Sequence, residues 1–155
     1  MIYKELPYKD FEGRDRKKTF FFSLSQTEFT ILNNRFEGGI EGYIKRIIED
    51  HDEEKLIDVI MLFVVEGYGI RESSDDFIKE DKEGRKLGNR FKCSEACDNL
   101  ITELLQKDND IWAFIIGMLP ASVQEKVKAK LEIEGASFTD DDGTVVPLHL
   151  PEEKT

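Results

Sequence analysis

The side chains that could carry acid–base or nucleophilic chemistry are few in this sequence. His51 and His149 are the only histidines among 155 residues, and neither belongs to a catalytic triad, a nucleophile elbow or a His-Glu-x-x-His pattern. His51 stands among acidic neighbours, where a solvated imidazole without a catalytic role is the simpler interpretation. We therefore expect no catalytic residue and no enzyme activity.

The residues that could hold a metal ion do not have the spacing of a known metal site either. Cys93 and Cys97 are four residues apart, which on a helix separates their Cβ atoms by about 5–6 Å, too far for a disulfide. We expect two reduced thiols that face a packed interior, and they lack the paired Cys-x-x-Cys spacing of zinc sites. The acidic run before Gly143 fails as a calcium loop, because Phe138 and His149 would take positions that need carboxylates. The sequence predicts no metal and no cofactor.

One basic cluster, residues 14–18, could contact phosphate groups. The chain as a whole, however, has 22 Lys and Arg against 33 Asp and Glu, a net charge of −11, which opposes binding to nucleic acid or to an anionic membrane. We interpret the cluster as the charged tip of a β-hairpin, where such residues discourage edge pairing. No apolar run approaches the roughly 18 residues of a membrane span, and the N-terminus lacks the order of a secretion signal. We expect no nucleic-acid partner, no membrane partner and a cytoplasmic location.

The elements that would position any site begin with strands. Residues 8–11 and 19–23 have strand-like composition and flank a charged, glycine-containing segment, 12–18, so they predict a hairpin within about residues 1–24. Side chains alternate along a strand, so Phe21 must point opposite to Phe20 and Phe22. One face of the hairpin should therefore pack on the core.

Helical patterns follow from residue 25 to residue 131. Ser25 and Glu28 have the spacing of a capping box, which predicts a helix that starts there and stops at the glycines 38 and 39. Asp52 is placed to cap a helix that is apolar on nearly every face over residues 56–65 and should be central in the fold. The polar stretch 71–89 is predicted to be a loop or a small excursion. Apolar residues recur at helical spacing in segments 40–48, 56–65, 94–105, 111–119 and 121–131.

Length and composition indicate one domain followed by a tail. With 39% hydrophobic residues, the chain can fill a single core. Residues 132–155 hold seven acidic side chains and one basic one, so they carry −6 of the total net charge of −11. Their glycines and prolines break any long helical or strand pattern. The sequence predicts a mainly α domain over residues 1–131, with an N-terminal β-hairpin and an acidic, flexible C-terminal tail.

Six blocks of sequence carry a resemblance to a known family. They are YKDFEG at 8–13, TFFFSLSQTE at 19–28, GGIEGYI at 38–44, GYGIRES at 67–73, FIK at 77–79 and WAFIIGMLP at 112–120. In content and collinear order they resemble the tail assembly chaperones of long-tailed, siphovirus-type phages and prophages of Gram-positive bacteria. The resemblance spans about residues 1–121.

The resemblance implies a small helical protein without enzymatic activity. Such proteins bind the tape measure protein in the host cell cytoplasm, help bring tail tube subunits to it, and are expected to be absent from the mature virion. Many copies on one client would favour self-association as a homo-oligomer, through apolar helices or the hairpin edge. The alternative is an acidic DNA mimic that inhibits a host defence nuclease. Candidate residues for client binding or self-association are Tyr43, Ile47, Tyr68, Trp112, Phe114 and Ile115.

Overall fold

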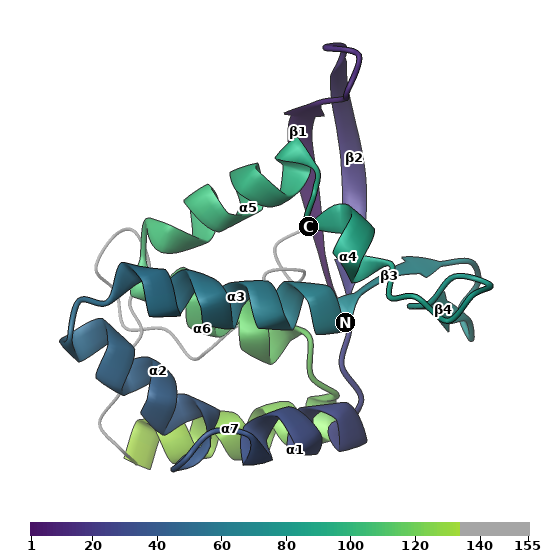
Figure 1. Cartoon of the computed structure of the whole chain (residues 1–155). Coiled ribbons are helices and arrows are strands. Elements are labelled where there is room, and N and C mark those ends of the chain that lie inside the picture. The colour runs from purple at the N-terminus through teal and green to yellow at the C-terminus, as the bar shows by residue number, and fades with distance from the viewer. Residues whose placement is uncertain (134–155) are drawn as a thin grey trace.

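The computed structural model describes residues 1–133, with the side chains of residues 108, 109 and 130–133 excepted. Within this range a helical body packs against a four-stranded antiparallel sheet with the strand order β1-β2-β3-β4 (Figure 1). The strands are β1 (Ile2–Lys9), β2 (Asp15–Phe22), β3 (Tyr68–Arg71) and β4 (Phe77–Ile78). The helices are α1 (Gln26–Asn34), α2 (Gly39–Glu49), α3 (Glu53–Gly67), α4 (Gly88–Phe91), α5 (Glu95–Leu105), α6 (Asp108–Gly117) and α7 (Ala121–Ile133).

The predicted hairpin is formed by β1 and β2, which pair from Ile2 opposite Phe22 to Lys9 opposite Asp15. Phe20 and Phe22 are buried, whereas Phe21 lies on the other face, so the predicted alternation is confirmed. The strands are longer than predicted, because charged residues that we assigned to the turn continue the ladder to its tip. Charged side chains are tolerated in a strand wherever both faces are open to solvent. Composition alone therefore did not predict the outer half of β2 as strand.

The predicted helix caps are present. The Ser25 hydroxyl accepts a hydrogen bond from the Glu28 amide at 3.1 Å, and the Glu28 carboxylate accepts one from the Ser25 amide at 2.9 Å, which completes the capping box. Asp52 accepts a hydrogen bond from the Lys55 amide at 3.1 Å at the start of α3. These two local signals fixed the starts of α1 and α3 correctly.

The core lies where α3 meets the hairpin and α6. Phe63 and Val64 of α3 are fully buried, as expected for a helix that is apolar on nearly every face. Phe22 packs its ring against the rings of Phe91 and Phe114, with centroids 5.6 and 5.1 Å apart. Helix α5 packs against β1 and α6, and α2 packs against α3 (Figure 1). The predicted fold class, mainly α with an N-terminal β-hairpin, is confirmed.

One prediction about the middle of the chain is refined and one is wrong. Of the two alternatives for the polar stretch 71–89, the structure shows a small excursion and not a plain loop, because β3 and β4 pair there, Glu80 and Lys86 form a further bridge, and α4 follows. These elements are too short for hydrophobic periodicity to reveal them. Of the two cysteines, only Cys97 is buried, whereas Cys93 is exposed because it precedes the α5 cap at Ser94.

The predicted acidic tail lies almost wholly outside the described residues. Helix α7 runs to Ile133, and residues 134–155 follow it in the sequence. The division of the chain at residue 131 and the tail therefore stay predictions. Among the helices of residues 1–133, none combines the length and the apolar character that crossing a lipid bilayer requires.

Candidate functional site

Residues 68–87 form a projection that we call the arm. It contains β3, β4 and the turn closed by the Glu80–Lys86 bridge, and it extends away from the helical body (Figure 1). The arm joins the main sheet through only two pairs, Phe21 with Gly69 and Phe22 with Tyr68. A ribbon this short is not stable by itself in water, so contacts with the body must hold it in place.

Three ion pairs supply those contacts. The Lys79 ammonium lies 2.9 Å from both carboxylate oxygens of Glu28, and Lys86 pairs with Glu66 of α3. Burial would raise the pKa of Glu28, but the hydrogen bonds from Ser25 and Lys79 outweigh it and hold the pKa below its usual value. The same carboxylate thus caps α1 and anchors β4.

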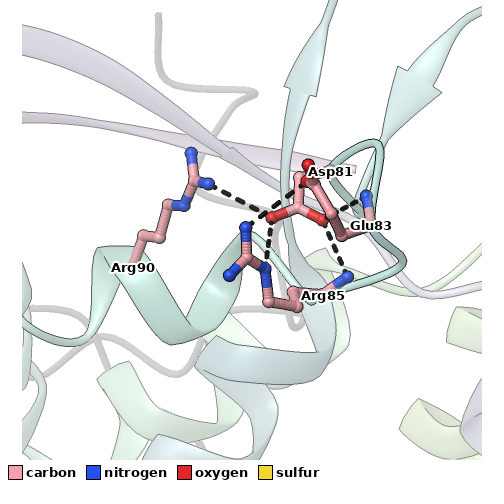
Figure 2. A network of polar contacts seen from close by, with 4 residues as sticks. All are labelled: Asp81, Glu83, Arg85 and Arg90. Atoms are coloured by element: carbon pink, nitrogen blue, oxygen red, sulfur yellow. Dashed lines mark hydrogen bonds and ion pairs between the residues drawn. The ribbon is translucent and has the colours of Figure 1, made fainter.

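The third ion pair belongs to a turn centred on Asp81 (Figure 2). One oxygen of this carboxylate accepts the backbone N–H groups of Glu83 and Arg85, both at 2.9 Å. The other oxygen accepts hydrogen bonds from Arg85 Nε at 3.0 Å and from Arg90 Nη2 at 3.1 Å. The backbone hydrogen bond from Arg85, together with its guanidinium, holds the pKa of Asp81 below its usual value. Because Arg90 belongs to α4, an ionised Asp81 ties the end of the arm to the body.

The same turn occurs at the tip of the hairpin. Asp10 accepts the backbone N–H groups of Glu12 and Arg14, both at 2.9 Å, and the Nε groups of Arg14 and Arg16, both at 3.1 Å. Both turns read Asp-x-Glu-Gly-Arg, at 10–14 and 81–85, and both glycines have a positive φ, 81° and 78°. This five-residue repeat is present in the sequence, but its role as a turn follows only from the hydrogen bonds of the two aspartates.

An aromatic pocket lies between the hairpin, the arm and α4. It is a cavity of about 230 Å³, and Tyr68 and Phe91 stack in its wall with ring centroids 4.7 Å apart and an interplanar angle of 17°. Burial raises the pKa of Tyr68, so its phenol is neutral at physiological pH. Other residues that line the pocket are Tyr8, Phe20, Ile70, Leu87, Arg90 and Ser94.

A second hollow, which we call the β4 groove, lies on another side of the arm. It has a volume of about 720 Å³ and runs between β4, the start of α1 and Pro120, with Met1 and Ile78 in its wall. Across the described residues, the large hydrophobic side chains that are at least 36% exposed are Met1, Phe11, Ile31, Ile70 and Ile78. Three of the five, Met1, Ile70 and Ile78, border the two hollows beside the arm.

The six residues predicted for association do not come together. Tyr68 lines the aromatic pocket. Tyr43 lies on α2, away from the arm, and its ring centroid is 4.6 Å from that of Phe36. The other four, Ile47, Trp112, Phe114 and Ile115, are 4%, 5%, 1% and 2% exposed. In this conformation these four side chains stabilise the core, and their part in association stays a prediction. Sequence reasoning missed Ile78 because it lies in the stretch 71–89, which was not interpreted as a strand, and missed Ile70 because it lies between that stretch and the predicted end of the preceding helix.

The described side chains contain no group of three or more His, Cys, Asp and Glu residues that could hold a metal ion. A rigid arm with exposed aliphatic side chains and two open hollows is typical of a protein-binding module. The family model of the phage tail assembly chaperones matches residues 1–154, and the chain belongs to this family. Its role therefore lies in the assembly of phage tails. No curated protein and no solved structure matches the chain.

Proposed function

We propose that this protein binds the tape measure protein during tail assembly and helps to recruit tail tube subunits to it. The observation that carries the proposal is the family match over residues 1–154, which supports a role in tail assembly. The proposal includes action in the host cell cytoplasm and release before the virion matures. It needs no catalytic residue, because a chaperone of this kind acts by holding its client.

The arm is the surface that we assign to the tape measure protein. This client is expected to be a long helix with an apolar stripe, and such helices bind through aliphatic and aromatic side chains at a groove. Ile70 and Ile78 are exposed on the arm, beside the aromatic pocket and the β4 groove. The ion pairs of Lys79, Asp81 and Lys86 hold the arm in place before the client binds, which lowers the entropic cost of binding.

The net charge fits the same role. An acidic chaperone with a charge of −11 would keep a complex with an apolar client in solution through charge repulsion between complexes. Self-association along the client also belongs to this proposal, since one long client offers many equivalent sites.

Co-expression with the tape measure protein tests the assignment of the arm. We expect the wild-type chain to raise the soluble fraction of the client, and the double variant Ile70→Asp, Ile78→Asp to lose most of this effect. Ile31→Asp is the control, because Ile31 is at least as exposed as Ile70 and Ile78 but lies on α1 outside the arm. If the wild-type chain leaves the client insoluble, tape measure binding is refuted. If the double variant works as well as Ile31→Asp, the arm is the wrong surface.

Recruitment of the tube protein needs a separate experiment. We expect the tail tube protein to be retained by immobilised chaperone bound to the tape measure protein, and to be lost when the chaperone is omitted. Equal retention on the tape measure protein alone would refute this half of the proposal.

A further inference from the structure

The outer half of β2 has an open edge. Strand β3 pairs with β2 only at Phe21 and Phe22, and β4 pairs with β3, so the arm diverges from the hairpin above this point (Figure 1). Residues 15–19 are all exposed and pair with β1 on one side only. Within residues 1–133, no other strand or loop forms backbone hydrogen bonds with this edge.

The hydrogen-bonding pattern shows which backbone groups point outward. The Asp10 amide donates to the Arg14 carbonyl at 3.0 Å, which makes these two residues a hydrogen-bonded pair. In an antiparallel ladder such pairs alternate, so Arg16 and Lys18 also bond to β1, and the amides and carbonyls of Lys17 and Thr19 point away from it. The other end of β2 agrees with this alternation. The Ser23 amide donates to the Gly67 carbonyl on the β3 side at 2.9 Å, so odd-numbered residues direct their backbone groups away from β1 there as well.

The opposite edge of the hairpin, on β1, is closed. Pro7 has no amide hydrogen, and its carbonyl accepts a hydrogen bond from Asn99 Nδ2 at 2.7 Å. The Lys9 amide donates to the Glu95 carboxylate at 3.2 Å. Helix α5 thus occupies the Pro7 carbonyl and the Lys9 amide of β1, while Lys17, directly opposite Pro7 on β2, keeps its outward amide open. The two edges of one hairpin therefore differ in a way that favours strand addition at β2 alone.

The face beside the open edge is apolar at one end and cationic at the other. Arg16 and Lys18 project on the same face as Phe20, which lines the aromatic pocket together with Ile70 and Arg90. Arg16 and Arg90 each have a carboxylate partner, Asp10 and Asp81, but Lys18 makes no ion pair with any described residue. A strand added along this edge would place one side chain over the pocket and the next one on the same face beside Lys18.

We infer that the open edge of β2 binds an extended segment of a partner protein as an additional antiparallel strand. The segment has an aromatic or large aliphatic residue that enters the aromatic pocket opposite Phe20, and a carboxylate two residues later opposite Lys18. Main-chain hydrogen bonds to Lys17 and Thr19 supply affinity, and the pocket and the ammonium group supply specificity. The segment bound at this edge differs from the helical client that we assigned to the arm, although both would lie beside the aromatic pocket.

A second copy of the same edge is a poor occupant. Two β2 strands pairing antiparallel about Lys17 would place Arg16 of one copy opposite Lys18 of the other, and like charges at opposite positions repel. The carboxylate-bearing segment of another protein removes that repulsion and neutralises Lys18.

The probe for this site is the synthetic peptide acetyl-Phe-Thr-Glu-Thr-Glu-Thr-amide, which starts opposite Phe20 because Gly69 already pairs with Phe21. In the antiparallel register its phenylalanine lies opposite Phe20 and its glutamates opposite Lys18 and Arg16. We expect saturable binding to the full chain, and at saturation at least about tenfold slower hydrogen exchange of the Lys17 and Thr19 amides. The Arg16 and Lys18 amides, already bonded to β1, should change little. A peptide with lysine in place of both glutamates should bind about tenfold more weakly or not at all.

Two substitutions at one position isolate the backbone contribution. Lys17→Pro removes an outward amide without breaking a bond to β1, and we expect it to weaken peptide binding at least about tenfold. Lys17→Ala keeps the amide and should stay within about threefold of wild type. Both variants lose the exposed ion pair with Glu5, so that loss cancels in the comparison. Circular dichroism and thermal unfolding establish that each variant is folded.

Three results would overturn the inference. The first is no binding of the peptide to the wild-type chain at about 1 mM. The second is binding without protection of the Lys17 and Thr19 amides, which needs no variant and so does not depend on whether Lys17→Pro folds. The third is protection of these amides in the chain alone at high concentration, which would show that a second copy already occupies the edge. None of these results bears on whether the tape measure protein is solubilised.

Discussion

Gly88 allows the backbone of α4 to approach that of α3 closely, and replacing it tests the packing of these two helices. A Cβ atom built on Gly88 would lie 2.2 Å from the Val65 carbonyl oxygen and 2.6 Å from the Val65 Cα. Ordinary contact needs more than about 3.4 Å, so Gly88→Ala must push the two backbones apart by about 1 Å. Unlike Gly13 or Gly84, Gly88 has no positive φ, so sterics alone account for the effect.

The expected cost follows from two opposing terms. Overpacking of this kind costs about 1–3 kcal/mol, and the upper end applies because the obstacle is backbone in the middle of the fold and cannot rotate away. Alanine is a better helix former than glycine by about 1 kcal/mol, which offsets part of the cost. We therefore expect Gly88→Ala to lower the free energy of unfolding by about 2 kcal/mol, which corresponds to a fall in Tm of about 6 °C.

Urea unfolding followed by the fluorescence of Trp112, which is buried in α6, measures this difference. Asn89→Ala is the matched control, because the neighbouring side chain is exposed and its loss should change stability by less than about 0.5 kcal/mol. If Gly88→Ala is as stable as the control, α4 is not packed on α3 as described. The aromatic pocket, whose wall includes Phe91 of α4, would then need revision.

Three further changes test the core, one carboxylate and the two thiols. Phe22→Ala should lower the free energy of unfolding by about 3–5 kcal/mol and Phe21→Ala by about 1 kcal/mol, because only Phe22 is fully buried; equal losses in urea unfolding would contradict the register. The folded state lowers the pKa of Glu28, so its stabilisation is present above the unfolded value and disappears as the pH falls through the folded one. Glu28→Gln should therefore be destabilising at pH 7 and become neutral only below the lowered folded pKa, and a pH-independent difference in unfolding free energy would refute this. Burial raises the pKa of Cys97 to about 11, so iodoacetamide at pH 8 should label Cys93 alone until urea unfolds the chain, as mass spectrometry would show.

Most of the helical body was predictable because its signals are local. A capping box depends on two side chains three residues apart, as at Ser25 and Glu28, and it formed as predicted. The burial of Phe63 follows from a segment that is apolar on nearly every face. The arm was not predictable by the same means, since a two-residue strand such as β4 has no periodicity and pairs only because β3 lies beside it.

The surface was less predictable than the core. Aromatic content singled out Trp112 and Phe114 as association residues, but size and hydrophobicity favour burial as much as binding, and both lie in the core. Ile70 and Ile78 are unremarkable in composition, and only the divergence of β3 from β2 leaves them exposed beside a hollow. The Asp-x-Glu-Gly-Arg turns were legible in the sequence, but their use at two ribbon tips was not.

The sequence by itself determined that this is a mainly helical acidic chain with an N-terminal hairpin, because caps, periodicity and charge act between residues close in the chain. The tertiary structure decided which edge of the hairpin is open and which is closed. Asn99 covers the Pro7 carbonyl from 92 residues away, while the neighbour of β2 turns aside after Gly69. Backbone hydrogen-bonding groups are the same in every residue, so only the arrangement of distant segments determines which of them remain available to a partner.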